Sequence, residues 1–522
     1  MSETSRSESH GPEIVIGEQL TLHDVVRVAR GAASAQLSPQ AREQLARTRG
    51  MLEAALERGE VIYGVNTGFG ALSETQIAAD QLDTLQRNLL RSHAVGVGAP
   101  LPPAYVRACL LMRAHTLSLG ASGVRPDLPE RLLEFLDAGL LPYVPEQGSV
   151  GASGDLAPLA HLALPLIGEG ELWVDGVRQP AAEGLARAGI APLHLGPKEG
   201  LSLINGTQVS TAISALAVHD ALELLSAADI VGAMSLDAHL GTARICDPRI
   251  HAGKPHPGQR RSAENIALLI EGSELNRSHA NCGRVQDAYS LRCMPQVHGS
   301  VREALRYVAR AIQIEINSFT DNPLVLLDDE GGFDVVSGGN FHAAAVALPA
   351  DHAAAAITTL GTISERRLDR QLNPESSRGL PAFLANDPGL ESGFMMAQVT
   401  ASALASECKA LSHPASVDTI PTSAGKEDHV SMGPIAARKL AKIADAVAHI
   451  LAIEASVAAR ALDLRGHQSS PRLRQTYEVI RRYVRPFEGD RSMSEEFEEL
   501  AAAIVRGELR EAAGLAPEWA EG

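Results

Sequence analysis

Aromatic residues are scarce in this chain, at 3% of its 522 residues, although 45% of the residues are hydrophobic. Strands favour aromatic and β-branched residues, whereas the abundant Ala and Leu favour helices. A chain of this length is expected to form two or more domains, or one domain with a very large core. We therefore predict a mainly α-helical globular protein.

The chain also lacks an excess of basic residues, and its formal net charge is −17. Binding to nucleic acid requires a basic face that matches the phosphates. We therefore expect no nucleic-acid partner, whereas a small zwitterionic substrate is compatible with this charge.

Cysteines are few, and their pattern excludes two kinds of site. The five cysteines are scattered and odd in number, and no Cys-X-X-Cys pair occurs among them. This pattern indicates reduced thiols rather than a zinc site or a disulfide framework. No cluster of His, Asp and Glu has a convincing ligand spacing either, so we expect no metal.

Segments that would target the chain to a membrane are lacking as well. Residues 1–13 are polar, unlike a signal peptide, and we expect them to be disordered. The most apolar long stretch, residues 341–363, contains Asp351 and His352, a pair that a membrane span would rarely tolerate. We expect a cytoplasmic protein that does not contact membranes.

The distribution of helical patterns suggests how the chain is organised. Ala- and Leu-rich patterns predict long helices, which would pack as a bundle, at residues 207–240, 299–318, 342–373, 391–412 and 433–464. Before them, residues 170–178 resemble a short hairpin that turns at Asp175-Gly176. We predict an N-terminal active-site region at residues 14–204, a central long-helix bundle at 205–465 and a C-terminal helical region at 466–522.

Two glycine-rich stretches, residues 63–70 and 148–155, interrupt the helical patterns. The second contains Ala152-Ser153-Gly154. If this tripeptide bends tightly, the Gly154 nitrogen reaches the carbonyl carbon of Ala152 and closes a five-membered ring. Loss of the Ser153 hydroxyl then leaves an exocyclic methylene, and the product is a methylidene-imidazolone, an electrophile that no ordinary side chain provides. Taken alone, however, Ala-Ser-Gly is a common loop sequence.

The surroundings of the tripeptide carry a family resemblance. The run GSVGASGDLAPLAH at residues 148–161 resembles the signature of the aromatic amino acid ammonia-lyase family. Similar blocks extend from about Leu22 to Arg506, at residues 63–70, 85–98, 198–208, 286–299, 320–323, 338–342 and 407–432. The resemblance implies a mostly α-helical protomer, a homotetramer with active sites shared between subunits, and autocatalytic formation of the electrophile without an external cofactor.

The resemblance also implies roles for individual residues. Tyr63 matches the base that accepts a proton from the β-carbon of the substrate. Arg292 matches the residue that binds the substrate carboxylate, because a planar guanidinium fits two oxygens. Asn205 is placed to donate a hydrogen bond to the ring oxygen of the electrophile. The other matches that line the electrophile or the substrate are Gln286, Tyr289 and Phe341.

Two further positions concern the side chain of the substrate. His93 stands where the family members that act on phenylalanine and tyrosine often differ, and a polar group there suits an imidazole. Glu427 stands where members that act on histidine carry Glu and members that act on phenylalanine carry Gln. The chain departs from many bacterial relatives at Gly425-Lys426, where they have Asn-Gln. We expect elimination of ammonia from L-histidine to give trans-urocanate, the first step of histidine degradation.

Five of these residues also have a structural interpretation: a packed tyrosine for Tyr63, a surface ion pair for Arg292, core packing for Phe341, a structural histidine for His93 and a solvated loop residue for Glu427. Two other functions stay open. A 2,3-aminomutase would use the same electrophile but return the amine to the β-carbon. A catalytically silent helical scaffold would keep the fold but would not need Ala152-Ser153-Gly154, Tyr63 and Arg292 together.

Overall fold

A computed structural model describes residues 13–62, 65–68, 76–280, 283, 285–328, 332–466 and 469–521. The expected disorder of residues 1–13 therefore falls, except for Glu13, outside the described residues. Contacts within the chain divide it into two compact units. Unit 1 comprises Met1–Leu216, Ala311–Ala350 and Pro414–Arg438, and unit 2 comprises Ala217–Arg310, Asp351–His413 and Lys439–Gly522.

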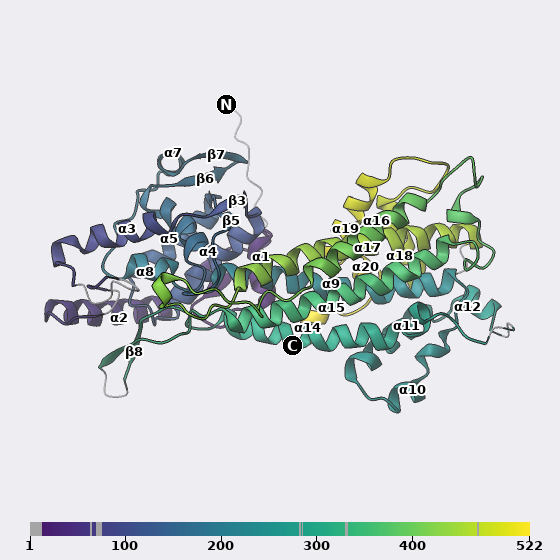
Figure 1. Ribbon diagram of the computed structural model, residues 1–522, viewed down its shortest axis with the longest axis horizontal. Helices are drawn as coiled ribbons and strands as arrows, with labels where there is room; N and C mark the ends of the chain where they lie inside the picture. Colours follow the sequence, from purple (N-terminus) through teal and green to yellow (C-terminus); the bar gives the residue numbers. More distant parts are fainter. Residues whose placement is uncertain are drawn as a thin grey trace. The chain divides into compact units, whose positions relative to one another are not determined.

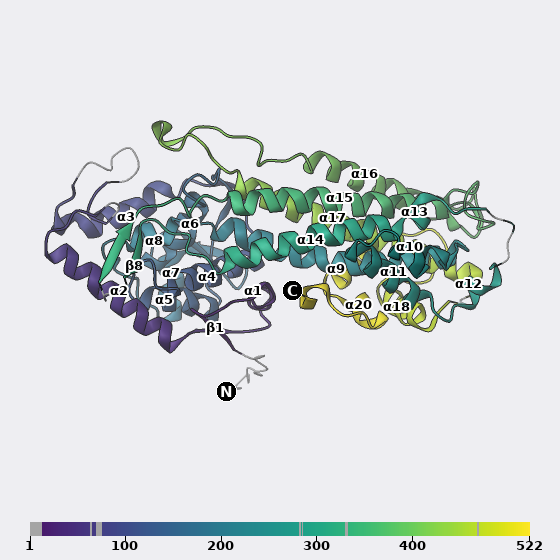
Figure 2. The ribbon, with the colours of Figure 1, turned by 90° about the horizontal axis from the view of Figure 1, so that it is seen from below.

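Long helices dominate the fold, as the Ala- and Leu-rich patterns predict. They are α9 (Gln208–Ala238), α14 (Met294–Ile316), α15 (Ala344–Leu372), α16 (Met395–Leu411) and α17 (Gly433–Arg465). Two perpendicular views show α14, α15 and α17 running side by side (Figures 1 and 2). The prediction of a mainly α-helical protein with a long-helix bundle is confirmed.

Small residues allow the bundle helices of unit 2 to approach closely. Gly361 of α15 faces α17, where an added Cβ would lie 3.1 Å from Val447 and 3.3 Å from Ile450. Along α17 the side chains that pack inward are Ala and branched aliphatic residues, and Leu451 and Val457 are fully buried. Close packing of such helices accounts for a large core that contains few aromatic residues.

A buried ion pair joins two of these helices within unit 2. Arg367 of α15 donates to both carboxylate oxygens of Glu454 on α17, at 2.6 and 2.9 Å, and both side chains are fully buried. Ser235 of α9 and Ser364 of α15 also donate to Glu454. Each buried charge thus has hydrogen-bond partners that offset the cost of removing it from water.

Shorter helices complete both units. In unit 1 they are α1 (Leu22–Ala29), α2 (Pro39–Glu57), α3 (Leu82–His93), α4 (Pro103–Ser118), α5 (Asp127–Asp137), α6 (Leu156–Ala163), α7 (Ala181–Ala188) and α8 (Glu199–Ile204). In unit 2 they are α10 (Pro248–Ala252), α11 (Pro257–Ile270), α12 (Glu274–Ser278), α13 (Tyr289–Arg292), α18 (Pro471–Tyr483), α19 (Ser494–Val505) and α20 (Glu508–Ala513).

Helix α4 forms the core of unit 1, and every residue from 108 to 118 is buried. Helices α1 and α5 pack against it. Helix α1 begins with a capping box, in which Thr21 accepts from the backbone of Asp24 while the Asp24 side chain accepts from the backbone of Thr21. Such reciprocal bonds satisfy amides that have no partner within the helix.

The strands are short and lie in unit 1. They are β1 (Ile14–Ile16), β2 (Ala35–Leu37), β3 (Val97–Pro100), β4 (Leu141–Pro142), β5 (Pro145–Gln147), β6 (Glu171–Val174), β7 (Val177–Pro180), β8 (Leu324–Leu327) and β9 (Phe333–Val336). Strands β6 and β7 form the predicted hairpin. Both turn residues, Asp175 and Gly176, have positive φ angles, which suit a tight two-residue turn.

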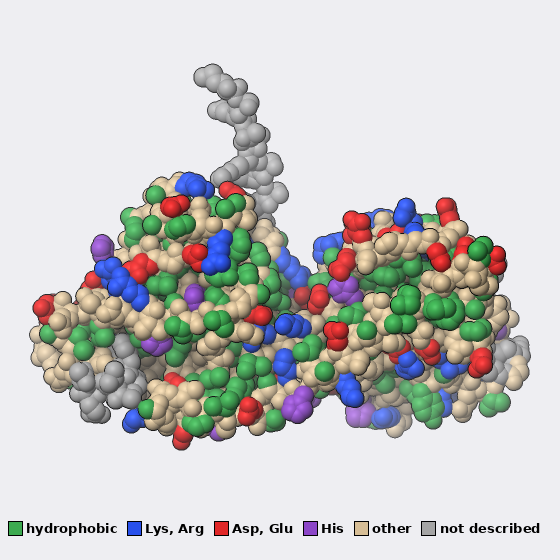
Figure 3. Space-filling model, turned by 45° about the horizontal axis from the view of Figure 1, so that its top comes forward, with side chains coloured by type: hydrophobic (Ala, Val, Ile, Leu, Met, Phe, Trp, Pro, Cys, Tyr) green, Lys and Arg blue, Asp and Glu red, His purple; other side chains and the backbone are tan. Residues whose placement is uncertain are grey.

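The surface mixes charges of both signs. On the face shown in Figure 3, acidic and basic side chains are interspersed over the part of the chain that is described. Among the described residues, none of the helices combines the length and the apolar character that a membrane crossing requires.

Removal of one partner will test the buried ion pair. Glu454→Ala leaves the Arg367 guanidinium buried without its carboxylate, so we expect the free energy of unfolding to fall by about 3–5 kcal/mol. Glu498, whose side chain is 70% exposed beside His449, provides the control. Glu498→Ala should change the free energy of unfolding by less than about 1 kcal/mol. Urea denaturation measures both variants, and equal losses would contradict the role given to the pair.

Candidate active site

The glycine-rich stretch at residues 148–155 forms a loop between strand β5 and helix α6. Strand β5 is fixed because it pairs antiparallel with β3. After the loop, Asp155 precedes the first residue of α6, and its backbone carbonyl accepts from the amide of Leu159. Both ends of the loop are therefore attached to regular structure.

The loop approaches a second backbone segment very closely at Gly154. Gly154 and Gly206 form an isolated parallel bridge, and the Asp155 amide donates to the Gly206 carbonyl at 2.7 Å. A Cβ on Gly154 would overlap the backbone of Gly206, and the φ angle of Gly154 is +77°. Only glycine meets both requirements at this position.

Asp155 anchors the end of the loop to the beginning of α9. Its carboxylate accepts from the Ser210 amide at 2.7 Å and from the Ser210 hydroxyl at 2.5 Å, and the side chain is fully buried. The amide of Ser210 lies in the first turn of α9, where backbone donors have no helical partner. Burial raises the pKa of the Asp155 carboxyl to about 6, although the hydrogen bonds from Ser210 lower it.

A buried polar cluster supports the turn that carries Asn205 and Gly206. Lys198, just before α8, forms an ion pair with Asp321 at 2.7 Å, and both side chains are almost fully buried. Arg113 of α4 donates to the Ser202 carbonyl and to the Gln208 side chain. These bonds hold the residues on both sides of the turn in place.

Asn205 contacts the Ala152-Ser153-Gly154 tripeptide directly. Its side-chain nitrogen donates to the Ser153 carbonyl at 3.2 Å. Its side-chain oxygen is buried, with no hydrogen-bond partner among the described residues. The donor therefore points at the oxygen that would become the ring oxygen of a cyclised tripeptide, and the role of Asn205 stays a prediction.

Glu427, which belongs to the last of the three segments of unit 1, contacts the same tripeptide. The Ser153 hydroxyl donates to one carboxylate oxygen of Glu427 at 2.7 Å. The Thr422 hydroxyl donates to the other oxygen at 2.6 Å. Thr422 and Glu427 also form an isolated antiparallel bridge, so the carboxylate has a fixed orientation.

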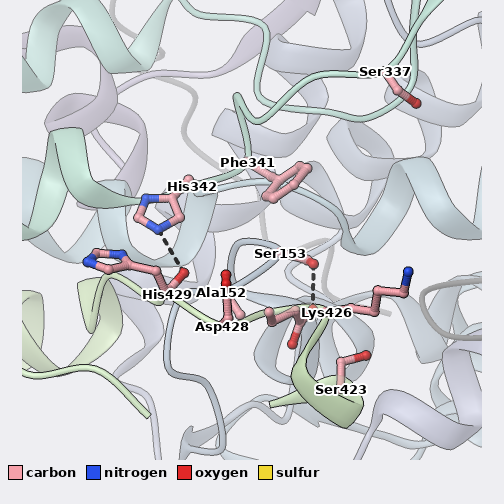
Figure 4. A pocket seen from close by; sticks show the side chains of 10 residues that line it. Ala152, Ser153, Ser337, Phe341, His342, Ser423, Lys426, Asp428 and His429 are labelled. Carbon is pink, nitrogen blue, oxygen red and sulfur yellow. Dashed lines mark hydrogen bonds between the residues drawn. The ribbon is translucent and has the colours of Figure 1, made fainter. Parts of the chain in front are cut away.

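These groups open into a cavity of about 390 Å³ (Figure 4). Its described lining consists of Ala152, Ser153, Ser337, Phe341, His342, Ser423, Lys426, Glu427, Asp428 and His429. The rings of His342 and His429 are stacked, with centroids 5.8 Å apart. Within unit 1 the structure thus brings together the tripeptide, Asn205, Phe341 and Glu427.

The described lining of the cavity does not include two other predicted site residues, Tyr63 and His93. Tyr63 is outside the described residues. His93 ends α3, where its Nδ1 lies 2.8 Å from the Leu89 carbonyl and 3.0 Å from the Ser92 hydroxyl, and it is absent from the described lining of the cavity. The predicted role of His93 therefore stays a prediction.

Three predicted residues belong to unit 2. Tyr289 and Arg292 lie on the short helix α13, and the Arg292 guanidinium carbon is 4.5 Å from the centroid of the Tyr289 ring. Tyr289 is 71% exposed and Gln286 is also exposed. The Tyr289 and Gln286 side chains are thus available on the surface of a single copy of the chain, whereas Arg292 is partly buried.

Comparison with known proteins identifies the family. Residues 20–482 match the sequence profile of the family described as aromatic amino acid lyase. The chain belongs to the aromatic amino acid lyase family. The family resemblance of the sequence is thereby confirmed.

Relatives within the aromatic amino acid lyase family are similar over nearly their whole length. A histidine ammonia-lyase of Sorangium cellulosum is 50% identical over 502 residues, which cover 95% of this chain and 98% of that protein. A histidine ammonia-lyase of Gloeobacter violaceus is 51% identical over 500 residues, with coverage of 96% and 97%.

Solved structures share the fold. Histidine ammonia-lyase from Trypanosoma cruzi has a TM-score of 0.89 at 38% identity and covers 97% of this chain and 96% of its own. Tyrosine aminomutase from Streptomyces globisporus has a TM-score of 0.90 at 38% identity, with coverage of 96% and 98%. The fold of this family therefore accommodates both lyases and aminomutases.

Several residues at this cavity are not predicted from the sequence. The sequence patterns point neither to Thr422, which holds Glu427, nor to His342 and His429. Both histidines lie in runs that carry the family resemblance. Their closeness in the sequence to Phe341 and Glu427 is the signal that could have indicated that they line the same cavity. In the sequence Lys426 stands out only as a departure from relatives, yet it lines the cavity.

Asp155→Asn will test the buried carboxyl. The pKa of the Asp155 carboxyl is raised from 3.8 to about 6 in the folded state. Between these pH values the folded chain therefore binds more protons than the unfolded chain. The stability that the carboxyl contributes is therefore present at low pH and is lost as the pH rises through 6. Asn stays neutral, so the stability deficit of Asp155→Asn should shrink from pH 4 to pH 7 by on the order of 3 kcal/mol. Urea denaturation across this range measures it, and a deficit independent of pH would contradict the raised pKa.

Proposed function

We propose that this protein acts as a histidine ammonia-lyase, a carbon–nitrogen lyase that converts L-histidine to trans-urocanate and ammonia, the first step of histidine degradation. Full-length relatives of that activity at about 50% identity support the substrate. The observation that carries the proposal is the position of Ser153, whose hydroxyl meets Glu427 and whose carbonyl meets Asn205.

The electrophile of the proposed reaction is a methylidene-imidazolone formed from Ala152, Ser153 and Gly154 without an external cofactor. The surroundings of the tripeptide fit this group. Gly154 lacks a Cβ where the backbone is most crowded, and Asn205 offers a donor to the Ser153 oxygen that the ring would retain. The group supplies an electrophilic carbon that helps the substrate amine to leave.

The side chains of the site then divide the remaining work. Tyr63 accepts the proton from the β-carbon of the substrate as a general base. Arg292 binds the carboxylate through two nitrogens and so orients the reacting carbons. Glu427 accepts from an imidazole N–H or assists proton transfer, and its bond from Thr422 holds it ready for this role.

The other predicted residues shape the substrate site. His93 offers a polar partner to the imidazole. Phe341 lies over the cavity beside the tripeptide (Figure 4). Gln286 and Tyr289 line the electrophile or the substrate in this proposal.

We propose further that the protein is a cytoplasmic homotetramer whose active sites are shared between subunits. In this assembly Gln286, Tyr289 and Arg292 of one copy complete a site built on the tripeptide of another. The exposure of Tyr289 and Gln286 in a single copy supports this arrangement. The free thiols of Cys109, Cys246, Cys293 and Cys408 support a reducing compartment.

An aminomutase is the second candidate, because a tyrosine aminomutase shares the fold at a TM-score of 0.90. Such an enzyme would return the amine to the β-carbon of its substrate. Product analysis after incubation with L-histidine and L-tyrosine separates the two. Urocanate with an equal amount of ammonia supports the lyase, and a β-amino acid supports the aminomutase.

Ser153→Ala should abolish elimination, because alanine has no hydroxyl to lose and the methylene cannot form. We expect kcat to fall by more than about a thousandfold, as it does when other covalent catalysts are removed. Ser337→Ala removes a hydroxyl from the same cavity without changing the tripeptide and should retain most of the turnover. Ammonia release and melting temperatures measure both variants. Wild-type turnover by Ser153→Ala would refute the proposed electrophile.

Selection of the imidazole side chain should depend on Glu427 and His93. A phenyl ring would leave these polar groups unpaired, at a cost of about 1–3 kcal/mol each when buried. Wild type should therefore strongly prefer histidine to phenylalanine. Glu427→Gln and His93→Leu should each lower kcat/KM for histidine about ten- to a hundredfold with little change in melting temperature.

The matched control is Glu407→Gln, because Glu407 is an exposed carboxylate on α16 that is absent from the described lining of the cavity. It should leave kcat/KM unchanged. Equal use of phenylalanine by wild type, or full histidine activity in both site variants, would contradict the assignment of the imidazole partners.

A further inference from the structure

Residues 430–433 lie against the first half of the loop that carries the tripeptide. The Met432 amide donates to the Val150 carbonyl at 2.8 Å. The Ser431 hydroxyl donates to the Gly151 carbonyl at 3.0 Å and accepts from the Gly433 amide at 3.2 Å. A single serine thus connects the loop with the first residue of helix α17.

The fit at this contact is tight. Ser431 is only 4% exposed, and a Cβ on Gly151 would overlap the Ser431 hydroxyl oxygen. Gly151 has a φ angle of +68°, which side-chain-bearing residues rarely adopt. Beside the serine, Ala152 packs with Val430 and Met432 in one apolar cluster. Ser431 is therefore directed at the loop and has no freedom to bond elsewhere without disturbing this packing.

The second half of the loop is held independently. Gly154 and Asp155 contact Gly206, and Ser210 binds the Asp155 carboxylate. Within the loop, Ser149 accepts from the Gly151 amide and donates to the Gly154 carbonyl at 3.2 Å. The reactive tripeptide therefore lies between two fixed points, one at each end.

We propose that Ser431 is a positioning residue for the formation of the electrophile, an inference that rests on the proposed function. By holding the Gly151 carbonyl, Ser431 fixes the planar peptide unit that joins Gly151 to Ala152. The Ala152 carbonyl carbon is then presented to the Gly154 nitrogen, which is held at the other end. Ring closure benefits because less conformational freedom remains to be lost.

The chemical step balances without any added reagent. The Gly154 nitrogen forms a bond to the Ala152 carbonyl carbon. The Ala152 oxygen leaves as water with the Gly154 and Ser153 amide protons, and a carbon–nitrogen double bond to Ser153 remains. The Ser153 hydroxyl then leaves as a second water with the proton from its α-carbon. Ser431 takes no part in these bond changes.

A positioning role predicts a specific pattern of effects. Ser431 is absent from the described lining of the cavity, so its loss should slow ring closure but leave substrate binding unchanged. Each chain that has formed the electrophile should turn over histidine at the wild-type rate. A merely structural role would instead lower stability and alter turnover in every chain.

The test is a time course of ring closure in the full-length chain made by cell-free translation. The mass of the peptide that contains residues 148–161 is followed after synthesis, and loss of two waters marks a processed chain. Ser431→Ala should slow processing about tenfold, which corresponds to about 1.4 kcal/mol in the barrier. Ser118→Ala is the matched control, because it removes a buried hydroxyl that, among the described residues, donates only within its own helix. It should process at the wild-type rate.

Turnover and KM per processed chain should match wild type in both variants. Processing of Ser431→Ala at the wild-type rate would overturn the proposal. If Ser431→Ala does not fold, as judged by melting and gel filtration, Ser431→Cys decides, since it keeps the shape of the side chain with a somewhat larger sulfur and donates only weakly. Slower processing of Ser431→Cys supports the proposal, and an unchanged rate overturns it. An unprocessed but active wild type would instead refute the proposed function.

Discussion

The close approach of Gly154 to Gly206 is the constraint on which the rest of the site depends. Neither backbone could come so near if Gly154 carried a Cβ. The contact brings Asn205 within reach of the Ser153 carbonyl and lets Asp155 bind the first turn of α9. The absence of a Cβ at Gly154 thus allows the Asn205 donor, the Asp155 anchor and the bend of the tripeptide to occur together.

Both of the segments that hold the loop lead directly into long helices. Gly206 lies just before α9, which begins at Gln208, and Ser431 lies just before α17, which begins at Gly433. Loops alone would position such contacts poorly, because a short segment without packing samples many conformations. Attachment to the first turns of long helices gives the site the rigidity that a catalytic arrangement requires.

Local sequence features predicted much of the fold. Ala- and Leu-rich segments predicted α9, α15 and α17 closely, because the pattern of a long buried helix is strong wherever it occurs. The start of α16 was less accurate, since Gly393 has a positive φ angle and the helix begins only at Met395. The division into three regions along the sequence stays a prediction, and the two compact units are each assembled from separate parts of the chain.

The site was harder to predict from local patterns, because its contacts join residues far apart in the sequence. Ser153 and Glu427 are separated by 274 residues, and Gly151 and Ser431 by 280. Family resemblance predicts roles for Asn205 and Glu427, whereas the hydrogen bonds of Thr422 and Ser431 are seen only in the folded structure. The most direct test of the central claim is the mass of the loop peptide from purified wild-type protein that releases ammonia from L-histidine. A mass lower by two waters than the unmodified sequence is the expected result, and an unmodified mass in active protein would contradict the claim.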